Sequence, residues 1–70
     1  MSLAASRTKL MTALRELHER WEQVCLDWDD DMSNDIHHTC IEPLESQVRA
    51  VIAAIEDMQH LVSRARSECA

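Results

Sequence analysis

The chain has 70 residues, with two Trp, one Pro and no Phe, Tyr or Gly. Small sheet proteins need turns with positive φ and favour aromatic and β-branched residues, so this composition excludes sandwiches, barrels and glycine-rich phosphate loops. The formal net charge of −6 disfavours nucleic acid as a partner, because phosphate backbones are bound by clustered Lys and Arg. We therefore expect one all-α domain over residues 1–70.

Apolar runs and cysteines indicate the compartment. No stretch approaches the ~18 consecutive apolar residues of a membrane span, and the first residues lack the charged start and apolar core of a signal peptide. Cys25, Cys40 and Cys69 form no C-x-x-C pair, and an odd number is unusual for a secreted disulfide scaffold. We expect reduced thiols, a cytoplasmic location and no membrane partner.

The first helix is predicted over about residues 3–32. Its apolar residues recur at alternating spacings of four and three, which is the a/d pattern of left-handed helix packing. This row, or seam, consists of Leu10, Leu14, Leu17, Trp21, Val24 and Trp28.

A bend is predicted over about residues 33–40, because the seam of the first helix cannot continue. Further heptad steps from Trp28 reach only polar residues, which are Asp31, Asp35, His38, Glu42 and Glu45. The stretch 29–35 is also rich in Asp, Ser and Asn, which favour caps and turns.

The second helix is predicted over about residues 41–68. Thr39 and Glu42 have the spacing of a capping box, and Pro43 is tolerated in a first helical turn. A second a/d seam follows, consisting of Leu44, Val48, Val51, Ile55, Met58, Val62, Ala65 and Cys69. The two helices would form an antiparallel hairpin.

Two alternatives concern the bend. The first helix could continue to about residue 38 and end in a tighter turn. A single kinked helix of about 65 residues is also compatible with an apolar repeat every four residues, at Met32, Ile36, Cys40 and Leu44.

The apolar surface of each helix is wider than one seam requires, since Met11, Cys25, Met32, Ile52, Ala54 and Leu61 flank the two rows. Helices of this kind suit two neighbours, so we expect two hairpins to associate as a homodimeric four-helix bundle. The expected interface residues are Leu10, Leu14, Leu17, Trp21, Val24, Trp28, Val48, Val51, Ile52, Ile55, Met58 and Val62.

The charge distribution favours an antiparallel dimer. Residues 27–45 contain seven Asp and Glu and no Lys or Arg, whereas residues 1–20 carry a net charge of +2. Antiparallel hairpins would place each acidic bend near the termini of the partner, although salt screens such exposed charges.

The candidate metal ligands are Asp35, His37, His38 and Cys40, because carboxylate, imidazole and thiolate groups bind zinc and related metals. Adjacent histidines on a helix point about 100° apart, and the spacing matches no closed zinc motif. We expect a polar bend without a cofactor. A small metal-binding or metal-sensing bundle is the alternative.

The sequence contains no convincing catalytic set. His18 lies beside the seam, and Cys25 is one heptad, or about 10 Å, further along the helix. The leading hypothesis is a non-enzymatic structural or protein–protein interaction module. A further alternative is an acidic regulatory subunit, of the antitoxin or anti-activator type, that masks a basic partner.

Overall fold

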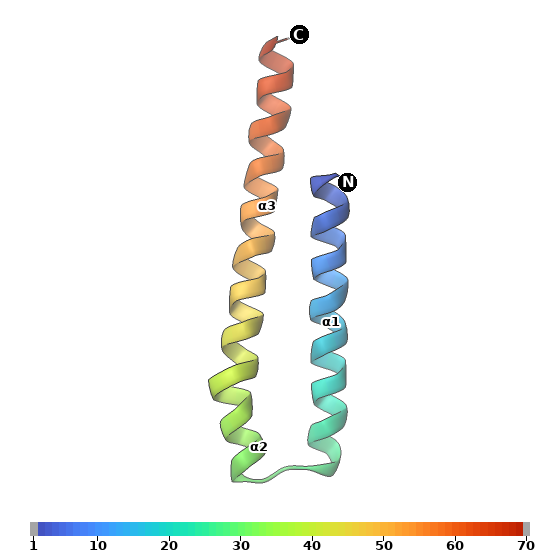
Figure 1. Ribbon diagram of the computed structural model, residues 1–70, viewed down its shortest axis with the longest axis vertical. Helices are drawn as coiled ribbons and strands as arrows, with labels where there is room; N and C mark the ends of the chain where they lie inside the picture. Colours follow the sequence, from blue (N-terminus) through green and yellow to red (C-terminus); the bar gives the residue numbers. More distant parts are fainter. Residues whose placement is uncertain (1, 70) are drawn as a thin grey trace.

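Two helical arms run antiparallel and are joined by a short link, in a computed structural model that describes residues 2–69 (Figure 1). The first arm is α1 (Leu3–Asp27). The second consists of α2 (Asp31–Ile36), a π-helical segment η1 (His37–Ile41) and α3 (Glu42–Cys69), which follow one another without a break. Residues 2–69 contain no strand. The all-α class is therefore confirmed, and the shape is hairpin-like.

The chain reverses at residues 28–30, so the predicted end of the first helix at 32 and the predicted bend at 33–40 are wrong. Asp30 caps the next helix, because its carboxylate accepts a 2.9 Å hydrogen bond from the Ser33 N–H. The Ser33 hydroxyl accepts a 3.0 Å bond from the Asp30 N–H, which completes a reciprocal capping box.

The helix dipole is consistent with a break that falls within the Asp run, at residues 28–30. Carboxylates are unfavourable at the C-terminus of a helix and favourable at an N-terminus. Ending α1 at Asp27 and starting α2 at Asp31 places Asp30 and Asp31 at the start of a helix. The same charges would otherwise lie in the last turn of α1.

The predicted start of the second helix at 41 is also wrong. The Thr39 hydroxyl donates to the Asp35 carbonyl at 2.6 Å, so Thr39 lies inside the helical arm and forms no cap. Within a helix, the ring of Pro43 would clash with the carbonyl four residues earlier. Directly before Pro43, the Glu42 N–H donates to the His37 carbonyl five residues back, and this π-helical turn is wider.

The link at residues 28–30 also excludes a single kinked helix of 65 residues. The four-residue apolar repeat that suggested it nevertheless describes the second arm, where Met32 and Leu44 belong to one helical run.

The inward face of the second arm is rotated relative to the predicted seam. Within residues 41–59, a row of buried and partly buried residues follows a 4-3-4-3-4 spacing, at Ile41, Glu45, Val48, Ile52, Ile55 and Gln59. Only Val48 and Ile55 belong to both rows. The predicted seam residues Leu44, Val51, Met58 and Val62 are exposed. On α1, Leu10, Leu14, Leu17 and Trp21 are partly buried, and Val24 is exposed. Trp28, directly after α1, is also partly buried.

Apolar burial within the hairpin is small. Ile55, at 7% exposure, is the single buried apolar side chain among residues 2–69. The second arm extends beyond the start of α1, and every residue from 60 to 69 is exposed (Figure 1). No helix within residues 2–69 combines the length and apolar character that crossing a membrane requires.

Candidate interaction surface

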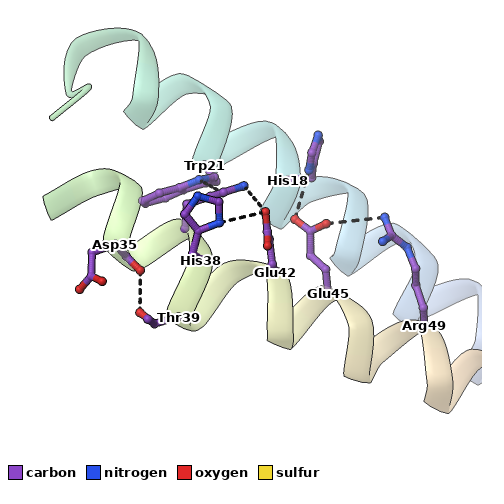
Figure 2. A network of polar contacts seen from close by, with 9 residues as sticks. His18, Trp21, Asp35, His38, Thr39, Glu42, Glu45 and Arg49 are labelled. Atoms are coloured by element: carbon purple, nitrogen blue, oxygen red, sulfur yellow. Dashed lines mark hydrogen bonds and ion pairs between the residues drawn. The ribbon is translucent and has the colours of Figure 1, made fainter. Parts of the chain in front are cut away.

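A polar cluster connects the two arms near the closed end of the hairpin (Figure 2). His18 on α1 lies between two carboxylates, with Nδ1 3.2 Å from Glu45 Oε1 and Nε2 2.9 Å from Glu22 Oε1. The hydrogen bond with Glu45 and the charge of Glu22 raise the pKa of His18 above its usual value. His18 was expected at the boundary of the seam, and the structure shows that both ring nitrogens have carboxylate partners.

Glu45 is a functional candidate that sequence reasoning missed. Its side chain is buried, with the residue 8% exposed, between His18 and the Arg49 guanidinium, whose Nη2 lies 3.6 Å from Glu45 Oε2 (Figure 2). A buried carboxylate needs such partners, because losing water is costly for a charge. The available signal was the spacing of Ile41, Glu45 and Val48, which places Glu45 in an otherwise apolar row.

A second set of contacts joins α1 to the π-helical segment. The Trp21 indole N–H donates to His37 Nδ1 at 2.9 Å, and the two ring planes lie within 8° of each other. Because Nδ1 accepts, His37 is the tautomer with a proton on Nε2, which lies 3.1 Å from Glu42 Oε1. His38 Nδ1 lies 3.3 Å from the same oxygen. These contacts fix the second arm beside α1.

The four candidate metal ligands do not converge. His37 and His38 meet at Glu42, whereas Asp35 accepts from Thr39 through its backbone carbonyl. Cys40 is exposed, with its sulfur 3.7 Å from the Thr39 hydroxyl. Within residues 2–69, no group of three or more His, Cys, Asp or Glu side chains has a geometry that could hold a metal ion.

Trp28 stabilises the link. Its indole N–H donates to Asp30 Oδ2 at 2.9 Å, while Asp30 Oδ1 accepts from the Ser33 N–H. These hydrogen bonds, first that of Ser33 and then that of Trp28, lower the pKa of Asp30. The closed end is therefore held by local contacts of the link itself.

One side of the hairpin contains a shallow groove between the arms, with a volume of about 400 Å³. Its floor is apolar and its rim carries charges, with the lining residues Met11, Leu14, Arg15, His18, Glu45, Arg49 and Ile52. Apolar and charged side chains therefore share the lining of this groove.

The other exposed apolar surface runs along α3. We define the outer stripe as six exposed residues at spacings of seven, three, four, three and four, which are Leu44, Val51, Ala54, Met58, Leu61 and Ala65. No turn or charged side chain interrupts it, since Gln47 occupies the one heptad position between Leu44 and Val51. The outer stripe is thus a regular apolar row of α3 that α1 leaves exposed.

Among residues 2–69, one ion pair joins the two arms at the open end. Arg7 Nε on α1 donates to Glu56 Oε1 on α3 at 2.9 Å, and both side chains are partly exposed. Exposed ion pairs contribute at most about 1 kcal/mol, so this contact aligns the arms more than it stabilises them.

Comparisons with protein-family models, with curated proteins and with solved structures find no match to this chain.

Proposed function

We propose that this chain is a non-enzymatic structural or protein–protein interaction module, and that two copies associate as a four-helix bundle. The observation that carries the proposal is the small core of the hairpin, in which Ile55 is the one buried apolar side chain of residues 2–69. The exposed apolar residues of α3 form a row with heptad spacing, which is the pattern that packs against another helix.

The energetics favour a second copy. Full burial of a Val, Leu or Ile side chain contributes about 1.5–3 kcal/mol, whereas ordering the backbone costs about 1–2 kcal/mol per residue. Small chains meet this cost only with a large apolar core or an additional stabilising feature, and oligomerisation is one such feature. Burying the outer stripe against an identical stripe would supply apolar contacts that the hairpin lacks.

The polar residues of the hairpin support a structural role. Polar contacts join the arms: His18 of the first arm contacts Glu45 of the second, and Trp21 of the first arm donates a hydrogen bond to His37 of the second. Both ring nitrogens of His18 contact carboxylates, those of Glu22 and Glu45, and neither contact is with the Cys25 thiol. A structural role accounts for both histidines without a reacting group.

The molar mass in solution tests the proposal. Light scattering on a purified sample at micromolar concentration should give about 16 kDa, which is twice the chain mass of 8.1 kDa. A stable particle of one chain mass that melts cooperatively would contradict the proposal. The same measurement with a chelator should be unchanged, and dissociation by chelator would favour the metal-binding alternative.

A further inference from the structure

The outer stripe faces a different direction from the row that packs against α1. At about 100° of rotation per residue, the outer stripe lies roughly 110° around α3 from the inward row. A helix in a four-helix bundle contacts two neighbours on adjacent sides, and this angle fits that arrangement. α1 occupies the first position and the outer stripe is available for a second helix.

From this geometry we propose that the outer stripe of α3 pairs with the outer stripe of a second copy in antiparallel orientation. The exposed end of each α3, residues 60–69, then lies along the closed end of the partner. The inference rests on the proposed homodimer and specifies which surface forms it and in which direction.

The alternative surface on the groove side is less suitable. Met11 is exposed there, but Arg15, Arg49 and the polar pair of His18 and Glu45 line the same groove. Burying these charges against another helix would cost free energy unless each gained a partner. The outer stripe has only apolar residues and one Gln at its heptad positions, so its burial carries no such cost.

Residue size also favours pairing of the two α3 helices. Two small residues, Ala54 and Ala65, lie among the larger side chains Val51, Met58 and Leu61 along the stripe. Small residues facing large ones across an interface allow two helices to approach closely and interdigitate. An antiparallel register that places Leu44 opposite Leu61 of the second copy also places Val51 opposite Ala54, and in this central pair a large residue faces a small one.

Charge determines the orientation. The closed end, residues 27–45, contains seven Asp and Glu and no Lys or Arg. The exposed end of α3 carries Arg64 and Arg66 against Glu68 alone. A parallel pair would bring two acidic ends together, whereas an antiparallel pair places the two arginines near the acidic end of the second copy. Complementary charges of this kind fix register and orientation.

The distance between the two copies of Cys69 tests the orientation. A chain with Cys25→Ser and Cys40→Ser can be spin-labelled at Cys69, which is exposed, and the distance measured by pulsed electron paramagnetic resonance. In the proposed register, 33 residues separate position 69 from the position opposite its counterpart, so the labels should lie about 50 Å apart.

The result distinguishes three cases. A separation of about 10 Å, the spacing of neighbouring helices, would show a parallel pair and overturn the inference while leaving the homodimer intact. A particle of one chain mass without a second label in range would overturn the homodimer and the inference together. A distance of about 50 Å supports both.

Two matched variants test the surface. Val51, 50% exposed, lies on the outer stripe, and Met11, 45% exposed, lies in the groove. Val51→Glu should weaken association by more than about tenfold, because it places a charge in an apolar interface. Met11→Glu should leave association within about threefold of the parent. Equal effects, or a larger effect of Met11→Glu, would overturn the assignment of the interface to α3.

Discussion

The two ends of the hairpin are stabilised in different ways. At the closed end, the Asp30 carboxylate accepts hydrogen bonds from the Trp28 indole and the Ser33 backbone N–H. A further hydrogen bond, from Trp21 to His37, joins the two arms. At the open end, residues 60–69 are exposed and Arg7–Glu56 is the ion pair between the arms. The closed end is therefore defined by contacts within the chain, whereas the apolar and basic side chains of residues 60–69 are exposed.

The largest loss of stability is expected at Ile55, which lies in the row of α3 that faces α1. Ile55→Ala should lower the free energy of unfolding by about 2–5 kcal/mol, because it leaves a cavity at the one buried apolar position of residues 2–69. Leu17→Ala, in the facing row of α1, should lower the free energy of unfolding by a similar amount. Chemical denaturation measures the change, and Ser63→Ala, on an exposed side of α3, is the control at less than about 0.5 kcal/mol. Similar values for Ile55→Ala and Ser63→Ala would show that the arms do not pack at this row.

An intermediate effect is expected at the closed end. Asp30→Ala removes the cap of α2 and should cost about 1 kcal/mol. Asp29→Ala is the matched control, since it removes the neighbouring carboxylate without removing the cap, and should change stability by less than about 0.5 kcal/mol. If the two variants lost the same stability, charge and not capping would determine the position of the link.

The smallest effect concerns pH. Because contacts with Glu45 and Glu22 raise the pKa of His18 in the folded chain, protonated His18 stabilises the fold. This contribution is fully present below the unfolded pKa of 6.5 and is lost as the pH rises through the higher folded pKa. The melting temperature should therefore fall between about pH 6 and pH 8 by more in the parent than in His18→Gln. His60→Gln, at an exposed position of α3, should retain the dependence of the parent. An unchanged dependence in His18→Gln would mean that other groups cause it.

Composition and apolar spacing within the sequence are sufficient to predict the all-α class. The absence of Gly and the spacing of Leu10, Leu14 and Leu17 predicted helices with an apolar row, and the structure places these three residues toward the second arm. The position of the link was not predicted, because two capping boxes compete. The Asp30–Ser33 box forms, whereas the Thr39 hydroxyl donates to the Asp35 carbonyl and forms no cap.

Non-local pairing explains the remaining differences. Glu45 points inward because His18, 27 residues earlier, provides a partner, and a pattern within one helix contains no information about that pairing. Trp21 and His37 are similarly separated by 16 residues. The sequence predicts Trp21 as a seam residue and His37 as a candidate metal ligand, and neither prediction includes their contact. The rotation of α3 that follows from these contacts exposes Val51 and Met58 and creates the outer stripe.

The concentration dependence of thermal unfolding tests the central claim, which is that a second copy completes the hairpin. Since folding and association are then one event, a hundredfold increase in protein concentration should raise the melting temperature by roughly 5–10 °C. Calorimetry over that range, at fixed pH and salt, provides the measurement. A melting temperature that stays constant across the range would show that one hairpin is stable alone and would contradict the account.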